Sequence, residues 1–389
     1  MFAGISGNIF ILGIVSLLTD VSSEMVYPLI PLFVTTVLGA GPAFLGTIEG
    51  VAESTASLLK LLSGMWSDRV RDRKKFVLLG YGISSLSRPL IAIATAPWMV
   101  LAVRFGDRMG KGIRTAPRDA LVADSVDASV RGKAFGLHRS FDHAGAILGP
   151  LAATAVLATL TTDVRTVFWL SAIPGVMAVV LIMWKVKEVA ADRKRATGKP
   201  NFLTMVPRGQ MRTYLLILLL FTLGNSSDAF LLLRASELGV EKAHIPILWM
   251  YFHVVKMLFT MPFGALSDKI GRRSVIVAGW GIYSLSYIGF ALASSALHVW
   301  LLFGIYGFFY AFTEGVEKAL MTDIVPATDR GSAFGWYNFA IGVGAFPASV
   351  MFGAIWQKFG AAVAFSFGAA LAGVAAVLLL ALVRPVRTA

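Results

Sequence analysis

The 389-residue sequence contains no cysteine, only five histidines, and 15% charged residues. The absence of cysteine excludes disulfide bonds, thiolate metal ligands and a cysteine nucleophile. The histidines have no partners at the spacing of metal ligands, so we expect no metal site. The chain also lacks GxSxG and GxxxxGK[ST] sequences, which argues against an enzyme embedded in a membrane and against ATP as a direct energy source.

Apolar residues make up 57% of the chain, and the mean hydropathy is +0.73. Soluble proteins are about 45–50% apolar and about 25% charged, so the composition excludes an ordinary water-soluble protein. Twelve mostly apolar stretches are long enough to cross a bilayer, which takes about 20 residues. They lie at 7–36, 43–66, 76–95, 98–122, 132–160, 166–185, 213–236, 245–266, 274–294, 298–322, 332–356 and 361–383. The predicted fold class is an all-α membrane protein with 12 transmembrane helices.

The net charge of +13 is distributed asymmetrically along the chain. With the N-terminus inside the cell, the inner loops and tail hold 21 Lys and Arg residues, and the outer loops hold only Arg165, Lys242 and Lys358. Lys and Arg are retained on the cytoplasmic side of membrane proteins. The basic charge therefore indicates a topology in the inner membrane with both termini in the cytoplasm, and we expect no nucleic-acid partner.

One long polar connection, residues 187–212, follows the sixth stretch and divides the chain into six-helix bundles at 1–186 and 213–389. The bundles repeat one another at a spacing of about 200 residues. The segment GMWSDR, which begins at Gly64, matches GALSDKIGRR, which begins at Gly264. Internal repeats of this kind are typical of transporters. The sequence therefore predicts two pseudo-symmetric bundles.

The segment that begins at Gly264 resembles the GxxxD[RK]xGRR motif of the major facilitator superfamily, and the resemblance covers the whole chain. In the first copy, Arg71 stands where the motif has Gly and Asp72 where it has Arg. We expect the first glycine of each copy to let a neighbouring helix approach closely, and the aspartate to accept hydrogen bonds from the amides at the start of a facing helix. The motif residues are Gly64, Asp68, Arg69, Gly264, Asp268 and Arg272.

The fifth stretch contains Gly136, Gly145, Gly149, Pro150 and Ala153. Their spacing resembles the GxxxxxxxxGxxxGPxxG motif, with Ala in place of the last Gly. That motif is associated with the proton-coupled antiporters of the superfamily, so the resemblance implies an exporter of drugs or metabolites. A packing face of small residues is the alternative interpretation.

The fourth stretch carries charged residues at spacings of three and four, which place them in one stripe of a helix. They are Arg104, Asp107, Lys111, Arg114 and Arg118, with Arg108 beside the stripe. A charge at the bilayer centre costs at least about 2.5–3.5 kcal/mol, so the stripe is expected to line a wet cavity or to pair with acids of other helices. We expect Asp107, between bases, to stay ionised as a structural pivot. His138 and Asp142 are one turn apart, so they can pair as a group that titrates near neutrality, and a structural place at a bundle seam is the more frequent alternative.

Acidic residues inside the other stretches are candidates for a gate or for proton carriers. Burial favours the neutral form of a carboxyl group, and an adjacent cation favours the charged form. Asp20 and Glu24 have no Lys or Arg within a helical turn, so they are the first candidates for proton coupling, followed by Glu49 and Glu53. The residues expected to form a substrate cavity or a gate are Asp107, Arg108, Lys111, Arg114, Arg118, Asp228, Glu314 and Glu317.

The leading functional interpretation is a secondary transporter that works by alternating access and exports small organic compounds, drug-like molecules or a siderophore, in exchange for protons. It needs no cofactor, because the proton gradient supplies the energy, and its expected partners are a small-molecule substrate and the lipid bilayer. A monomer is the expected state. An importer or exchanger of an organic anion, suggested by the stripe of bases, is the alternative, and a membrane-embedded enzyme or lipid-handling protein is a third hypothesis.

The charge distribution predicts which parts of the chain are reached from the cytoplasm. Tags at either end, or inserted at about residue 198, are expected to be labelled by impermeant reagents only after the membrane is opened, because Lys and Arg keep these segments inside. A tag inserted near Lys242 serves as the control that is labelled in intact cells. Labelling of either terminus in intact cells would contradict this topology.

Overall fold

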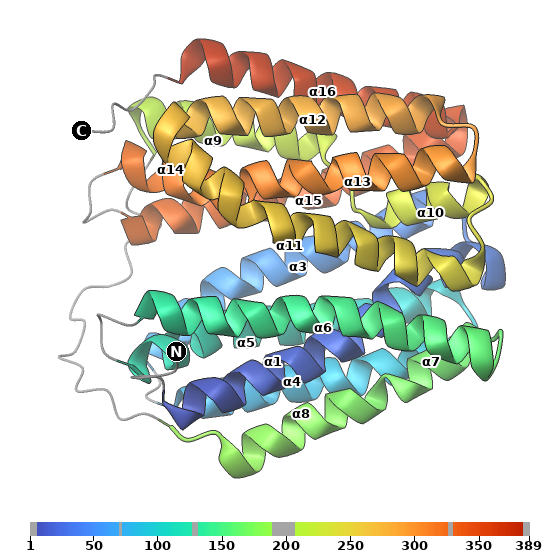
Figure 1. The fold of residues 1–389 in the computed structure, drawn as a ribbon, viewed down its shortest axis with the longest axis vertical. Helices are drawn as coiled ribbons and strands as arrows, with labels where there is room; N and C mark the ends of the chain where they lie inside the picture. The colour runs from blue at the N-terminus through green and yellow to red at the C-terminus, as the bar shows by residue number, and fades with distance from the viewer. Residues whose placement is uncertain (1–5, 70–71, 127–130, 189–206, 326–329, 384–389) are drawn as a thin grey trace. The chain divides into compact units, whose positions relative to one another are not determined.

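The computed structural model describes residues 6–69, 72–126, 131–188, 207–325 and 330–383, and it describes the backbone alone at 64, 65, 67–69, 131–133, 322 and 330–332. Within these residues all regular elements are helical (Figure 1). The α-helices are α1 (Gly7–Val26), α2 (Ile30–Leu32), α3 (Pro42–Arg69), α4 (Arg73–Leu90), α5 (Pro97–Asp124), α6 (Arg131–Thr159), α7 (Val164–Leu170), α8 (Ala172–Lys185), α9 (Gly209–Gly224), α10 (Ala229–Glu237), α11 (Ile245–Ile270), α12 (Arg272–Leu292), α13 (Ala296–Thr313), α14 (Val316–Ile324), α15 (Arg330–Phe359) and α16 (Ala361–Leu382).

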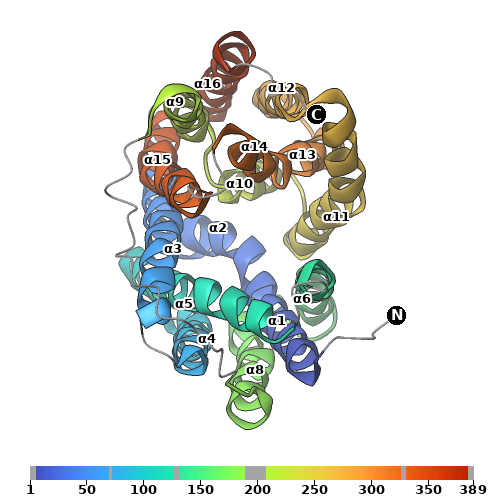
Figure 2. The same ribbon diagram turned by 90° about the vertical axis from the view of Figure 1, so that its left-hand side faces the viewer.

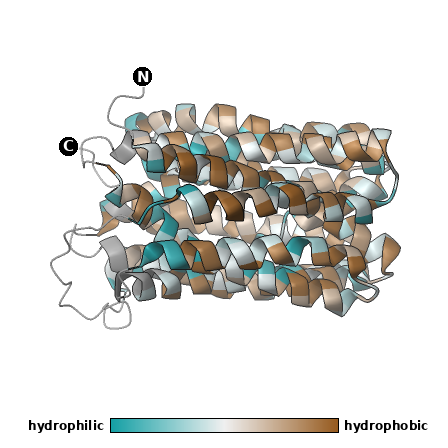
Figure 3. Cartoon of the chain, turned by 90° about the horizontal axis from the view of Figure 1, so that it is seen from below, coloured by the Kyte–Doolittle hydropathy of each residue, from teal (hydrophilic) through white to brown (hydrophobic). Residues whose placement is uncertain are grey.

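Ten of the described helices or runs of consecutive helices are long and apolar enough to cross a membrane. They are Gly7–Val37, Arg73–Ile93, Ala134–Thr159, Val164–Lys185, Gly209–Glu237, Lys242–Ile270, Arg272–Leu292, Ala296–Met321, Ala333–Phe359 and Ala361–Leu382. The stretches expected at 43–66 and 98–122 form α3 and α5, which have 28 residues each. At 1.5 Å per residue each helix is about 42 Å long, which is enough to cross a membrane. Because they carry several charged residues, these two helices are not among the ten apolar ones. Figure 3 shows such hydrophilic positions between the hydrophobic ones along the helices.

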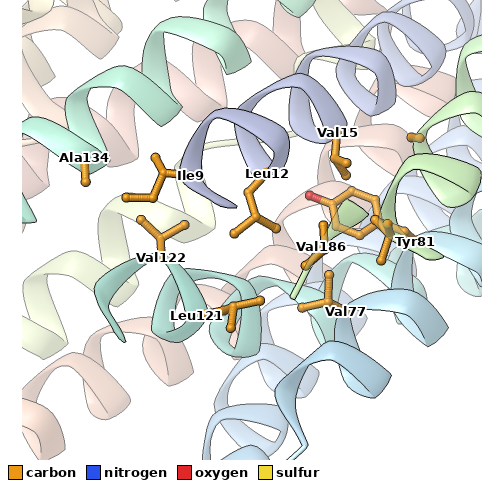
Figure 4. Close-up of a cluster of buried hydrophobic side chains, with 11 residues drawn as sticks. Ile9, Leu12, Val15, Val77, Tyr81, Leu121, Val122, Ala134 and Val186 are labelled. Carbon is orange, nitrogen blue, oxygen red and sulfur yellow. The ribbon is translucent and has the colours of Figure 1, made fainter. Parts of the chain in front are cut away.

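The chain folds into two compact units, and the first contains residues 1–34 and 55–200. In this unit α1 packs along α6, α4 packs along α5, and α8 packs against α1 and α4. Figure 4 shows the apolar cluster that these contacts bury, in which Leu12 of α1, Tyr81 of α4, Leu121 of α5 and Ala134 of α6 are all buried. The core of this unit therefore joins helices from both ends of its sequence.

The second unit contains residues 35–54 and 201–389. Here α9 packs along α15, α12 packs along α13, and α16 packs against α9 and α12 (Figure 2). This pairing repeats that of the first unit, with α9, α12, α13, α15 and α16 in the places of α1, α4, α5, α6 and α8. The repeat in the sequence thus has a counterpart in the way the helices pair within each unit.

The first half of α3 belongs to the second unit. Ser54 donates a hydrogen bond of 2.6 Å to the backbone oxygen of Gly342 in α15. At Gly50 a Cβ atom would lie 2.9 Å from the backbone oxygen of Phe346, so a larger residue would push the two helices apart. Residues 35–54 therefore pack with α15, although the rest of α3 belongs to the first unit.

Six of the ten spans in the described residues are not continuous α-helices, and the breaks in three of them lie near candidate functional residues. Pro28 and Pro31 lie in the first, where α1 gives way to a 3-10 turn at Tyr27–Leu29, to α2, and to a π-helical turn at Phe33–Val37. Proline lacks the amide hydrogen that a helix needs. The chain leaves the helix between Gly224 and Ala229, and again between Thr313 and Val316. These breaks expose backbone groups and polar side chains inside otherwise apolar segments.

Candidate functional site

The glycines of the expected antiporter motif lie against the first two candidate proton carriers. A Cβ atom at Gly145 of α6 would lie 2.7 Å from the Cβ of Asp20, and one at Gly149 would lie 2.8 Å from the Cβ of Glu24. Both glycines also face backbone oxygens of α1, those of Leu17 and Val21. Any side chain at these positions would separate α1 from α6 at the level of the two acids. Two features that the sequence showed separately thus meet at one helix seam.

Bases of α5 act on Asp20 across the interior of the first unit. Lys111 and Arg114 attract its carboxylate, while Glu24 and Asp142 repel it. The sequence showed only that no base lies within a helical turn of Asp20 on its own helix. The tertiary structure supplies bases from another helix, so the carboxylate of Asp20 is coupled to the stripe on α5.

Asp142 of α6 holds a second polar cluster in the first unit. Its Oδ1 accepts a hydrogen bond of 2.5 Å from Ser16 of α1 and lies 3.5 Å from Nδ1 of His138. The pairing of His138 with Asp142 expected from their spacing is confirmed. Arg118 of α5 also donates to Ser16, at 3.4 Å, so this cluster joins α1, α5 and α6.

Asp107 of α5 has a partner that the sequence did not indicate. Arg88 of α4 donates from Nε to Asp107 Oδ1 at 3.1 Å and from a terminal nitrogen to the backbone oxygen of Thr19 at 3.0 Å. The expected neighbour Arg104 is 3.8 Å from the other carboxylate oxygen. All three charged side chains are buried. Arg88 follows a run of serines and precedes Pro89 in the third predicted stretch, 76–95. It is the one charged residue of that stretch, and this feature of the sequence could have identified it as a partner.

The remaining bases of the stripe differ in their surroundings. Arg114 is buried, donates to Ser84 at 2.6 Å and lies 4.5 Å over the ring of Tyr81. Arg118 forms its shortest ion pair, 2.8 Å, with the next residue in the chain, Asp119. Arg108 is buried, whereas Lys111 is exposed. Arg114 therefore contacts a polar and an aromatic side chain of α4. The sequence pattern had predicted acidic side chains as the partners of the stripe.

In the second unit, Asp228 lies at the break between α9 and α10. Its two carboxylate oxygens accept hydrogen bonds from the hydroxyl groups of two α13 tyrosines, Tyr306 at 2.6 Å and Tyr310 at 3.0 Å. Ser227, at the same break, donates to Glu49 of α3 at 3.2 Å. Glu53, one turn further along α3, repels Asp228 electrostatically. The structure thus brings three predicted acids together and leaves Asp20 and Glu24 in the other unit.

Glu314 and Glu317 have different partners, although they are three residues apart. Lys256 of α11 forms an ion pair of 2.9 Å with Glu314. Glu317 is buried and accepts hydrogen bonds from Trp280 at 2.9 Å and from Tyr337 at 2.8 Å. The Gly315 break between α13 and α14 lies between the two acids. Glu317 is therefore held by neutral donors and Glu314 by a base.

In each unit, an arginine at the end of the motif segment forms an ion pair with an aspartate of a later helix. Arg73, the first residue of α4, pairs with Asp124 at the end of α5. Arg272, the first residue of α12, lies 2.8 Å from Asp323 in α14, and it also lies 3.5 Å from Asp268. Both members of the second pair follow those of the first by 199 residues. The pairs tie corresponding helix ends together in the two halves.

Among the other motif residues, one glycine does not have the close helix contact that was expected, and three residues lie where the structure does not describe side chains. A Cβ atom at Gly264 would meet open space within 4 Å, in contrast to the close helix approach expected there. Gly271, the second glycine of the motif, has a φ of +93° at the turn into α12, a conformation that favours glycine. The side chains at 64, 68 and 69, which carry the predictions for Gly64, Asp68 and Arg69, lie outside the described residues.

Asp72, which replaces the arginine of the motif, caps the start of α4. Its carboxylate accepts a hydrogen bond of 3.2 Å from the backbone nitrogen of Lys75 and lies 2.7 Å from the ammonium of that residue. The hydrogen bond from the Lys75 ammonium, more than the one from its backbone amide, holds the pKa of Asp72 below its ordinary value. The departure from the motif thus serves as a helix cap.

No group of three or more potential metal ligands among His, Asp and Glu occurs within the described part of the chain. The buried chemistry consists of carboxylates, guanidinium groups and tyrosines on helices that cross a membrane. Such groups can bind and release protons or hold a charged solute. A family model for the Major Facilitator Superfamily matches residues 12–233 and 214–389. The chain belongs to the major facilitator superfamily.

Relatives agree with this membership over nearly the whole chain. An uncharacterized MFS-type transporter of Methanocaldococcus jannaschii is 36% identical over 384 residues, which cover 97% of this chain and 95% of that protein. The multidrug resistance protein MdtH of Edwardsiella ictaluri is 24% identical over 342 residues, 87% of this chain and 84% of that protein. A solved variant of the nucleoside transporter NupG shares the superfamily fold, with a TM-score of 0.85 at 13% identity over 97% of this chain and 100% of that one.

The pairing of Arg88 with Asp107 predicts a strong stability effect. Replacing Arg88 with Met leaves a buried carboxylate without its 3.1 Å partner, so the free energy of unfolding should fall by about 3–5 kcal/mol. Thermal unfolding of the purified protein measures this change. Arg88→Lys, which keeps a base beside Asp107, should lose less, and Arg212→Met, at an exposed position, should lose little. An Arg88→Met variant as stable as the wild type would contradict this role.

Proposed function

We propose that this transporter exports small organic compounds in exchange for protons, by alternating access between a bundle at 1–186 and a bundle at 213–389, with 187–212 as the cytoplasmic linker. In this proposal the chain crosses the inner membrane 12 times, with both termini in the cytoplasm. The observation that carries the proposal is the seam where Gly145 and Gly149 of α6 meet α1 beside Asp20 and Glu24. It joins the antiporter motif to carboxyl groups that can carry a proton.

The electrostatics around Asp20 suggest how a proton could change the conformation. The ionised carboxylate is attracted by Lys111 and Arg114 of α5. Protonation removes that attraction and also the repulsion from Glu24 and Asp142, so the preferred positions of α1, α5 and α6 differ between the two states. At Gly145 and Gly149, α6 places no side chain against α1, so the two backbones can adjust at these points at small steric cost. Differential stabilisation of two states is what coupling requires.

The support that the relatives give for export comes from the names of those proteins. The protein from Edwardsiella ictaluri is called a multidrug resistance protein, which agrees with efflux of drug-like molecules. Glu49, Glu53 and Asp228 remain proposed as further proton-binding groups, because the acids of α3 act on the break at Asp228 in the second unit. Arg118, Glu314 and Glu317 remain proposed as parts of a cavity or a gate.

Proton coupling is tested by removing the charge at the seam. Asp20→Asn and Glu24→Gln should each abolish export driven by a pH gradient, because neither amide can release a proton, while the amount of folded protein in the membrane stays the same. Substrate uptake into inverted vesicles, which corresponds to export from the cell, measures this under an imposed pH gradient. Asp163→Asn, at the cap of α7, is the matched control and should export normally. Normal rates in both seam variants would remove Asp20 and Glu24 from the coupling.

An importer or exchanger of an organic anion is the second candidate. The observation that favours it is a group of four buried guanidinium groups, those of Arg88, Arg104, Arg108 and Arg114, which all act electrostatically on the carboxylate of Asp107. Such a concentration of positive charge attracts an anionic substrate. This candidate predicts binding of organic anions near α5.

The two candidates differ in what Arg114 does. If Arg114 binds a substrate anion, Arg114→Gln should weaken the binding of organic anions such as benzoate by about tenfold or more, because a charge-assisted hydrogen bond is lost. Calorimetric titration of the purified protein measures the change, and Arg212→Gln is the exposed control. If Arg114 and Arg118 instead close a gate, binding survives and only the balance between inward-open and outward-open states shifts.

A further inference from the structure

The ammonium group of Lys256 lies in a small receptor made of one carboxylate and one aromatic ring. Its Nζ is 2.9 Å from Oε2 of Glu314 and 4.7 Å from the centre of the Tyr310 ring. A carboxylate beside the face of a tyrosine is the arrangement that recognises organic ammonium ions, because both the negative charge and the ring quadrupole attract a cation. Lys256 comes from α11, and its two partners come from α13 and the break that follows it.

Neighbouring side chains hold the ring of Tyr310 in a fixed position. The hydroxyl of Tyr310 donates a hydrogen bond of 3.0 Å to Asp228, which Tyr306 also contacts at 2.6 Å. This bond orients the ring whose face Lys256 covers. The ring of Phe252, one turn before Lys256 on α11, packs edge-on against Tyr310 with the ring centres 5.4 Å apart. The aromatic face therefore has a defined position before any solute arrives, which lowers the entropic cost of binding.

A second carboxylate lies near the receptor. Asp228 accepts the hydrogen bond from the Tyr310 hydroxyl and also interacts electrostatically with Lys256. Two carboxylates, those of Glu314 and Asp228, therefore act on one ammonium group. The side chain of Glu314 is 37% exposed, and that of Lys256 is 15% exposed, so a solute can approach the carboxylate while the lysine covers the ring.

We propose that Glu314 and Tyr310 form an organic-ammonium binding site of the transporter and that Lys256 is its built-in competitor. An amine substrate enters by replacing the Lys256 ammonium at the Glu314 carboxylate and on the ring of Tyr310. The inference rests on the proposed export of small organic compounds and specifies their class as apolar molecules that carry one ammonium group. Lys256 then sets the specificity, because only a cation that binds better than its tethered ammonium displaces it.

The site is tested by removing the competitor. The probe is benzyltrimethylammonium, titrated calorimetrically into the full-length protein in lipid nanodiscs. Lys256→Gln should bind the probe about tenfold more tightly than the wild type, the gain expected when a cation reaches a carboxylate and a ring that no ammonium occupies. Lys256→Arg should bind as weakly as the wild type. Lys358→Gln, which removes the same charge at an exposed position of α15, is the matched control and should show no gain.

Two further titrations separate a specific site from a general change in charge. Adding Glu314→Gln or Tyr310→Leu to Lys256→Gln should abolish the tenfold gain, because each removes one wall of the receptor. Neopentylbenzene, the neutral isostere of the probe, should bind the wild type and Lys256→Gln alike. An equal gain for the isostere, or no gain for the ammonium probe, would overturn the proposal.

A measurement on the wild type covers the case in which Lys256→Gln does not fold. Saturating benzyltrimethylammonium should make Lys256 several-fold more reactive towards an amine-acylating reagent, with Lys358 as the internal reference in the same mass spectrum. Unchanged reactivity at saturation would also overturn the proposal. Neither assay uses a proton gradient, so failure of the coupling test at Asp20 and Glu24 leaves this result intact, and loss of the ammonium site leaves proton-driven export standing.

Discussion

Burying an ionised group in a bilayer costs at least about 2.5–3.5 kcal/mol, and this constraint governs how the charged helices of the chain pair. Arg88 and Asp107 join α4 to α5, and the same arginine reaches α1 through the backbone oxygen of Thr19. Asp142 joins α6 to α1 through Ser16. These buried charges therefore join α4 to the next helix in the chain and both α4 and α6 to the distant α1. The apolar core of the first unit fills the space between these polar contacts.

The two units stabilise their buried carboxylates with different types of side chain, although their helices pair in the same way. In the first unit, guanidinium groups surround one carboxylate at Asp107. In the second, carboxylates are held by tyrosines and tryptophan, as at Asp228 and Glu317. The ion pair of Arg73 with Asp124 has a counterpart in Arg272 with Asp323, and both members are 199 residues further along the chain. The two units therefore share their helix pairing and this ion pair, while their described interior polar groups differ.

Breaks in the spans place several of the candidate groups. Asp228 follows the residues that leave the helix after Gly224, and Glu314 precedes the Gly315 break. Backbone groups that lose their helical partners inside a membrane must be satisfied by neighbouring side chains or a polar cavity. Ser226 and Ser227 contact Tyr287 and Glu49 at the first break. Irregular backbone and the candidate carboxylates therefore occur together, an arrangement typical of solute and ion sites in transporters.

The amino-acid sequence by itself determined the membrane class, the repeat, the superfamily and the residues that carry intramembrane charge, because hydropathy, spacing and motif glycines are local properties. It also predicted the contact of His138 with Asp142, since residues four apart share a helix face. Only the tertiary structure decided that Arg88 is the partner of Asp107, that bases of α5 act on Asp20, and that Glu49 belongs with Asp228. These pairings depend on how helices distant in the chain pack, which the charge pattern of any single helix does not contain.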